Sequence, residues 1–157
     1  MMAERDAPLV INGWTLLAHP LFIAQRDALI DEVEALKAKK PRTYATSNAA
    51  KRLAAIDSLI FDIIPQDPTR DEYRLGGTLG KERKHWFRAK FFQQYRLFFR
   101  YRREEKIILY AWVNDEKTLR AYGKKSDAYA IFKKMLEHDN PPDDWNALIE
   151  ACPGAFS

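Results

Sequence analysis

The sequence predicts an α+β fold, in which two N-terminal helices pack on an antiparallel sheet and a further helix follows near the C-terminus. Apolar residues recur with helical spacing before residue 65, alternate with a period of two between residues 85 and 113, and return to helical spacing after residue 126. With 157 residues, 46% of them hydrophobic, the chain can bury one core but hardly two. We therefore expect a single domain over residues 1–157.

The N-terminal part of the chain predicts a short strand and then a helix. Residues 10–18 are apolar around one glycine, which fits a short strand or an irregular approach to a helix and favours the strand. Pro20 suits the first turn of a helix, and the apolar residues after it keep helical spacing up to a cluster of lysines. Pro41 then ends this helix.

A second helix is expected to start at Ser47 or Asn48, either of which can cap it, and to end before Pro65. Residues 65–84 are rich in proline, glycine and charge. They predict a long connection with at most one short strand, around Tyr73–Leu75.

The middle of the chain predicts an antiparallel meander. Residues 85–92, 95–102 and 106–113 are dense in aromatic and β-branched side chains, and only a few polar residues separate them. Residues 126–137 then predict a capped amphipathic helix, and residues 141–149 a final turn or short helix. We expect the helices to cover one face of the sheet and to leave the other face open.

Positive charge is concentrated in the predicted strands. Residues 81–125 contain fourteen Lys and Arg against five Asp and Glu, a net charge of +9, whereas the rest of the chain contains twelve basic and seventeen acidic residues, a net charge of −5. Aromatic residues alternate with these cations, so a packed sheet must present the charges together. This combination favours a polyanion such as a nucleic acid as the partner.

The first two predicted strands form a hairpin whose register follows from their apolar faces. Both faces meet the same helices only if Phe91 opposes Tyr95, which predicts a three-residue loop over residues 92–94 or an equivalent bulge. Three cations then gather on the opposite face, where Arg88 is expected to be a solvent-side residue without a core role. They are Arg88, Lys90 and Arg96.

Several classes of protein are excluded or disfavoured. No apolar run is long enough for a membrane helix, and residues 1–8 do not resemble a secretory signal, so we expect a cytosolic protein. The single Cys152 cannot form an internal disulfide, and no His or Cys motif suits a metal. No cofactor or metal site is expected.

Four blocks of the sequence resemble the YhaV toxins within the RelE-like ribonucleases of toxin–antitoxin operons. They are NGWTLLAHP at residues 12–20, WFRAKF at 86–91, YRLFFRY at 95–101 and WVNDEKTLRAYGKKSDAY at 112–129. Together they cover most of the chain in the same order. The resemblance implies a RelE-like fold and cleavage of messenger RNA, at the ribosome, by attack of a ribose 2′-hydroxyl on the adjacent phosphate.

The resemblance also implies partners. A cognate antitoxin, of a PrlF-like type with an AbrB-type DNA-binding part, is expected to neutralise the toxin, and the complex is expected to bind operator DNA. Messenger RNA is the expected substrate.

The resemblance implies site residues as well. Basic residues before and within the YR element of the superfamily match Arg88, Lys90 and Arg96. The downstream basic residue and tyrosine have two candidate pairs here, Arg120 with Tyr122 and Lys125 with Tyr129, and both stay open. Preorganised cations can stabilise the charge that develops on the phosphoryl oxygens. Further cations are expected to bind RNA, namely Arg100, Arg102, Lys117 and Lys124.

Other interpretations remain beside this one. The basic, aromatic sheet also suits a non-catalytic RNA- or DNA-binding module, or a surface for an acidic protein. Residues 114–117 fit a base-reading segment and a simple turn equally well. His85 adjoins the cation cluster, where a general acid or base would lie, although a boundary residue is the more ordinary assignment.

Overall fold

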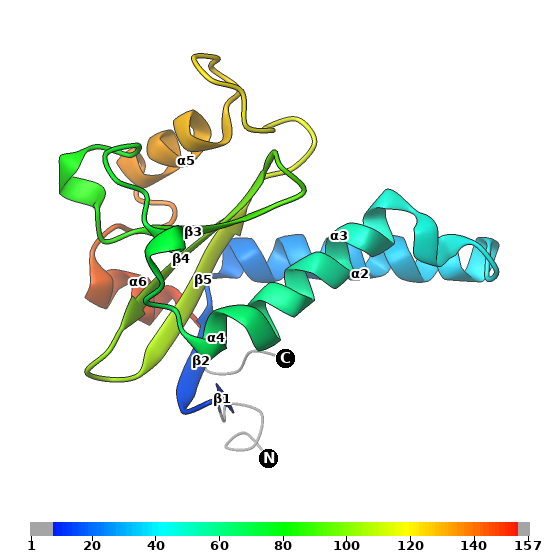
Figure 1. Cartoon of the computed structure of the whole chain (residues 1–157), viewed down its shortest axis with the longest axis horizontal. Coiled ribbons are helices and arrows are strands. Elements are labelled where there is room, and N and C mark those ends of the chain that lie inside the picture. Colours follow the sequence, from blue (N-terminus) through cyan, green and yellow to red (C-terminus); the bar gives the residue numbers. More distant parts are fainter. Residues whose placement is uncertain (1–7, 154–157) are drawn as a thin grey trace.

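The computed structural model describes residues 8–153, which form a five-stranded mixed sheet with helices on both faces (Figure 1). The strand order is β1-β2-β5-β4-β3. The elements are β1 (Leu9–Ile11), β2 (Trp14–Ala18), α2 (Pro20–Lys39), α3 (Asn48–Ser58), a π-helical turn (Leu59–Ile63), α4 (Ile64–Gln66), β3 (Phe87–Phe91), β4 (Tyr95–Arg102), β5 (Ile107–Val113), α5 (Ala128–Glu137) and α6 (Trp145–Ala151).

The predicted meander is confirmed, but the N-terminal strand is not a single strand. It is a hairpin, β1 and β2, which turns at Asn12 and Gly13 with φ values of 52° and 81°. An Asn-Gly pair tolerates this left-handed backbone, which is why the chain reverses there. β2 then pairs with β5 in parallel, Thr15 opposite Ile107, so the sheet is mixed and the expectation of a purely antiparallel sheet was wrong.

The two predicted N-terminal helices are confirmed and form a long helical hairpin (Figure 1). His19 caps α2 by accepting a hydrogen bond from the backbone N–H of Leu21, and Ser47 caps α3 in the same way through Ala50. The second helical segment does not end before Pro65. It continues with helical backbone through the π-helical turn into α4, whose second residue is Pro65.

The first core lies between this helical segment and one face of the sheet. Phe22, Ile60, Ile64 and Phe99 are fully buried there. The hydroxyl of Tyr110 donates to the main-chain carbonyl of Ile60 at 2.7 Å, and burial raises the pKa of this phenol well above its ordinary value. The base of the helical hairpin is therefore anchored on β5.

The second face of the sheet is covered, contrary to expectation. Residues 75–86, α5 and α6 pack on it around a separate aromatic cluster. The ring of Phe98 stacks on Phe132 at 4.3 Å between centroids, and Trp112 lies parallel to Phe132 at 5.7 Å. The sheet places these apolar rings on the same face as the cations, so an amphipathic helix must close that face.

The predicted short strand around Tyr73–Leu75 is reduced to a single bridge between Arg74 and Phe87. None of the helices within residues 8–153 has the length and apolar character of a membrane crossing. Residues 1–7, where no secretory signal was expected, lie outside the described part of the chain.

The aromatic cluster generates a prediction about stability. Phe132→Ala should lower the free energy of unfolding by about 3–5 kcal/mol, because it removes a fully buried ring that contacts three other rings. Urea unfolding followed by circular dichroism measures this. The neighbouring exposed Lys134→Ala is the control and should change stability by less than about 0.5 kcal/mol. Equal stability of both variants would mean that α5 does not close the second face.

Candidate functional site

The β3–β4 hairpin has the register that the apolar faces predict. Phe91 opposes Tyr95, Lys90 opposes Arg96, and the loop spans the three residues 92–94. The loop is tight because its first two residues take left-handed φ values of 46° and 63°. This register brings cations of the two strands onto one face of the sheet.

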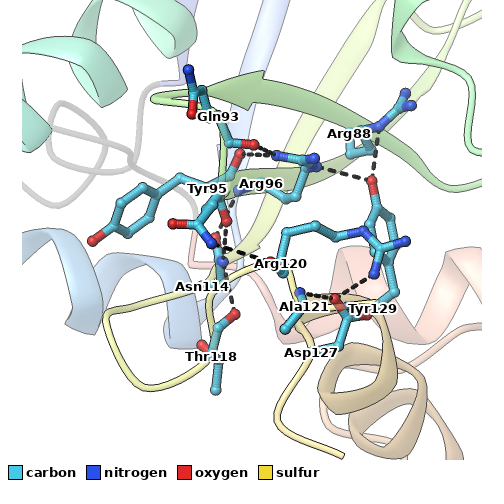
Figure 2. A network of polar contacts seen from close by, with 11 residues as sticks. Arg88, Gln93, Tyr95, Arg96, Asn114, Thr118, Arg120, Ala121, Asp127 and Tyr129 are labelled. Carbon is cyan, nitrogen blue, oxygen red and sulfur yellow. Dashed lines mark hydrogen bonds and ion pairs between the residues drawn. The ribbon is translucent and has the colours of Figure 1, made fainter. Parts of the chain in front are cut away.

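Arg96 is held inside the hairpin rather than at its surface. Only 5% of the residue is exposed. Its Nη1 donates to the carbonyls of Gln93 at 2.6 Å and Tyr95 at 2.9 Å, and its Nε donates to the hydroxyl of Tyr129 at 3.1 Å (Figure 2). The guanidinium therefore stabilises the hairpin loop and orients a tyrosine from α5.

Arg88 also has a structural role, so the expectation of a purely solvent-side residue was wrong. Its Nε donates to the Tyr129 hydroxyl at 3.0 Å. Its Nη1 donates to the carbonyls of Glu72 at 2.9 Å and Arg74 at 2.7 Å. These bonds form because the connection before β3 folds back along this edge strand and places its carbonyl groups beside the guanidinium.

Tyr129 is the junction of the site. It lies in the first turn of α5, is only 6% exposed, and its hydroxyl oxygen accepts hydrogen bonds from both Arg88 and Arg96 (Figure 2). A third guanidinium, that of Arg120, lies 4.5 Å from the centroid of its ring. With both contacts accepted at the oxygen, the hydroxyl proton remains available to a further acceptor.

One buried carboxylate positions Arg120 and Tyr129 together. Asp127, 5% exposed, forms an ion pair with Arg120 and accepts the backbone N–H groups of Ala121 at 2.7 Å and Tyr129 at 3.1 Å. It is therefore the N-cap of α5, which starts two residues later than predicted. Sequence reasoning missed this role. The available signal was an N-cap residue within a strongly basic segment.

Asn114 is a buried clamp between the hairpin and the following loop. Its Oδ1 accepts the backbone N–H of Arg96 at 2.7 Å, and its Nδ2 donates to the carbonyls of Gln94 at 3.0 Å and Thr118 at 2.8 Å. Both polar atoms of its side chain are therefore used within the chain. Of the two interpretations of residues 114–117, the structure therefore favours the turn.

Two surface depressions border the residues of this site. The first, of about 460 Å³, is bordered by Tyr129 and by a set of basic residues, Arg120, Lys124, Lys125 and Lys133. The second, of about 520 Å³, is bordered by Arg88 and the exposed Lys90 together with residues 71–74. Each depression thus borders one partner of the hydrogen bond between Arg88 and Tyr129.

The structure does not keep the two candidate pairs, Arg120 with Tyr122 and Lys125 with Tyr129, as separate pairs. Arg120 contacts both tyrosines, because its guanidinium lies 3.6 Å from the ring centroid of Tyr122 as well as over Tyr129. Tyr122 itself is 82% exposed. Lys125 borders the first depression. Of the two candidate tyrosines, it is therefore Tyr129 whose hydroxyl is hydrogen-bonded to Arg88 and Arg96.

Arg100 lies in the second core and away from both depressions. Its guanidinium is sandwiched between the rings of Trp86 at 5.4 Å and Trp145 at 5.1 Å and donates to the carbonyl of Asp143. Burial lowers its pKa to about 10, which leaves it charged at neutral pH. We leave it out of the RNA-binding residues, since α6 covers this part of the face.

The other predicted cations are exposed but scattered. Arg102 lies over Trp145 at the far end of β4, roughly 20 Å along the strand from Arg96. Lys117 is exposed in the turn after β5 and borders neither depression. Lys124 does border the first depression.

His85 belongs to a separate polar cluster. Its Nε2 lies 2.9 Å from Oδ1 of Asp143, which also accepts the indole N–H of Trp86 at 2.7 Å. Burial alone would raise the pKa of Asp143, but the hydrogen bonds from Trp86 and His85 bring it below its ordinary value. This placement fits the boundary role better than that of an acid or base beside Tyr129.

Within residues 8–153, no group of three or more His, Cys, Asp or Glu side chains has an arrangement that would hold a metal ion. The site is instead built from arginines, lysines and a phenol. Such a donor-rich surface on a small α+β fold defines a protein that binds a polyanionic chain, in the manner of basic nucleic-acid-handling proteins.

Comparison with known proteins gives the particular family. Residues 16–153 match the model of the YhaV toxins, described as toxins with endonuclease activity of a toxin–antitoxin system, and this chain belongs to that family. The resemblance seen in the sequence is confirmed. The chain is thus a toxin with endonuclease activity, and a toxin of this kind has a cognate antitoxin.

Curated relatives agree over almost the whole length. "Toxin YhaV" of Escherichia coli O6:H1 is 48% identical over 147 residues, which is 92% of this chain and 96% of the relative. "Ribonuclease toxin YhaV" of Escherichia coli K12 is 48% identical over 145 residues, or 91% and 94% of the two chains. No solved structure matches this chain.

Proposed function

We propose that this toxin is an endoribonuclease that cleaves messenger RNA by attack of a ribose 2′-hydroxyl on the adjacent phosphate. The attacking oxygen displaces the 5′ oxygen, which leaves a cyclic phosphate and a 5′-hydroxyl end. The observation that carries the proposal is the Tyr129 hydroxyl held between Arg88 and Arg96, with Arg120 over the same ring. The name of the K12 relative, a ribonuclease toxin, agrees with RNA as the substrate.

Charge stabilisation is the main task of such a site, because in-line attack concentrates negative charge on the phosphoryl oxygens. Arg88 and Arg120 border the two depressions, so we assign them to the phosphate. Arg96 is buried and already bonded to two carbonyls, so we assign it to holding the Tyr129 hydroxyl.

Proton transfer is the second task. The 2′-hydroxyl must lose a proton to a base, and the departing 5′ oxygen must gain one. We assign one of these transfers to Tyr129, whose hydroxyl proton is not directed at either arginine. Lys125, which borders the same depression, is our candidate for a further basic group.

Substrate binding extends beyond the reacting phosphate. We assign the exposed Lys90 and Lys124, next to the two depressions, to RNA phosphates, with Lys117 and Arg102 as more distant contacts. We further propose that the chain acts in the cytoplasm on messenger RNA at the ribosome. Its antitoxin would be PrlF-like with an AbrB-type DNA-binding part, and the complex would bind operator DNA.

The alternative considered from the sequence, a nucleic-acid-binding surface that does not cut, disagrees with the endonuclease activity of the family. It would need the same cations but no hydroxyl at residue 129. The two proposals therefore differ in what removal of that hydroxyl does.

Tyr129→Phe should lower the rate of RNA cleavage by about 10²- to 10⁴-fold, because it removes the proposed proton-transferring group. RNA binding should change little, since the cations stay. Single-turnover cleavage of a labelled RNA and binding of a 2′-O-methyl analogue measure the two quantities. Tyr44→Phe, at the tip of the helical hairpin, removes a hydroxyl elsewhere and is the matched control. Undiminished cleavage by Tyr129→Phe would contradict the assignment.

Arg96→Ala should abolish growth inhibition, and Arg96→Lys should restore only part of it. A lysine keeps the charge, but one ammonium group cannot reproduce the directed donors to Tyr129 and to two carbonyls. Growth after induced expression, with circular dichroism of the purified proteins, tests this. Arg42→Ala removes an exposed arginine from the helical hairpin and should stay toxic. Full toxicity of the lysine variant would show that charge alone suffices.

Cleavage should persist in excess EDTA and weaken steeply with added salt. The site has cations where metal-dependent nucleases have carboxylates, and several phosphate contacts release counterions on binding. Free RNA is the right substrate, because EDTA dissociates ribosomes. Loss of cleavage on chelation with recovery in Mg²⁺ would overturn the mechanism even if RNA were the target.

A further inference from the structure

Tyr122 is one of three large hydrophobic residues that stand exposed within residues 8–153, and at 82% it is the most exposed of them. It lies in the loop between β5 and α5, beside the first depression. Exposure of an aromatic ring to water costs free energy that a packed loop would normally avoid. The ring therefore offers apolar surface that a ligand can cover.

The ring nevertheless lies against one positioned side chain. Arg120 covers one face at 3.6 Å from the centroid, and Asp127 holds both that guanidinium and the backbone N–H of Ala121. A turn closes over the ring's own residue, because Lys124 donates its N–H to the carbonyl of Ala121 at 3.1 Å. One face of Tyr122 thus rests on a cation, and the rest of the ring faces solvent.

The surroundings of the ring are strongly basic. The adjoining depression is bordered by Lys124, Lys125 and Lys133. Its one acid, Asp127, is buried and already paired with Arg120. A ligand that suits this place has a flat apolar face next to a negative charge, and each nucleotide of a single strand has both.

We propose that Tyr122 is a stacking platform for one base of a single-stranded RNA, while a neighbouring phosphate lies in the depression at Lys133. This rests on the proposed function and adds a subsite to it. The role belongs to the ring face, which a cation behind it keeps oriented, and not to the hydroxyl. Arg120 then belongs to both subsites, because its guanidinium lies 3.6 Å from the ring centroid of Tyr122 and 4.5 Å from that of Tyr129, whereas Tyr122 only binds RNA.

The experiment compares two probes of equal charge. One is a short 2′-O-methyl oligouridine, which cannot be cleaved because its 2′-oxygens are blocked, and the other is the same backbone with abasic residues. Fluorescence anisotropy gives the affinity of each. The parent protein should prefer the base-bearing probe roughly 5- to 150-fold, the range expected for one stacked base.

Three variants separate the contributions. Tyr122→Ala should abolish the preference for bases, and Tyr122→Phe should retain it, since the ring remains. Lys133→Ala should lower the affinity for both probes by the same factor. Tyr44→Ala is the matched control, because Tyr44 also lies against a cation, Lys37 at 5.8 Å, but on the distant helical hairpin.

Three other outcomes would contradict the proposed stacking role of Tyr122. If Tyr122→Ala still prefers the base-bearing probe, the bases stack on another residue. If Tyr122→Ala loses the same affinity for both probes, Tyr122 is a structural residue. If the parent protein binds an acidic peptide such as polyglutamate more strongly than either probe, the ring belongs to a protein-binding surface. Because both probes resist cleavage, failure here leaves the nuclease proposal intact, whereas an inactive parent enzyme on ordinary RNA would overturn that proposal separately.

Discussion

The structure of the site depends on two hydrogen bonds that Arg88 and Arg96 donate to the single hydroxyl of Tyr129. They join three elements, because the arginines belong to β3 and β4 and the tyrosine to α5. Bonds between a charged donor and a neutral acceptor are stronger than neutral ones and restrict the geometry of both groups. The position of α5 over the sheet and the position of the reactive hydroxyl are therefore set by the same contacts.

Clustered arginines repel one another, and the protein offsets that repulsion with main-chain carbonyls. Arg96 is bonded to the carbonyls of two hairpin residues, and Arg88 to two carbonyls of the connection before β3. Only Arg120 has a carboxylate, that of Asp127. Carbonyl dipoles stabilise a cation without cancelling its charge, so the site keeps a positive potential for a phosphate chain. A carboxylate at each arginine would have neutralised it.

The aromatic cluster of the second face explains how this basic site is kept rigid. Phe98 lies between Arg96 and Arg100 in sequence and points to the same face, where it stacks on Phe132 of α5. Helix α5 is thus packed by apolar rings within one turn of Tyr129. An open sheet face, as expected from the α+β architecture, would have left both the rings and the tyrosine without support.

The sequence by itself determined the local features, namely the two N-terminal helices, the three-stranded meander, the register that opposes Lys90 to Arg96, and the concentration of cations. These follow from periodicity and from turn chemistry, which act over a few neighbouring residues. Only the tertiary structure decided which of two tyrosines meets the arginines. That choice depends on Asp127 and Asn114, which join segments separated by a loop whose path no local pattern encodes. The parallel pairing of β2 with β5 and the closure of the second face were likewise set by contacts between elements distant in the chain, where burial of apolar surface outweighs local preference.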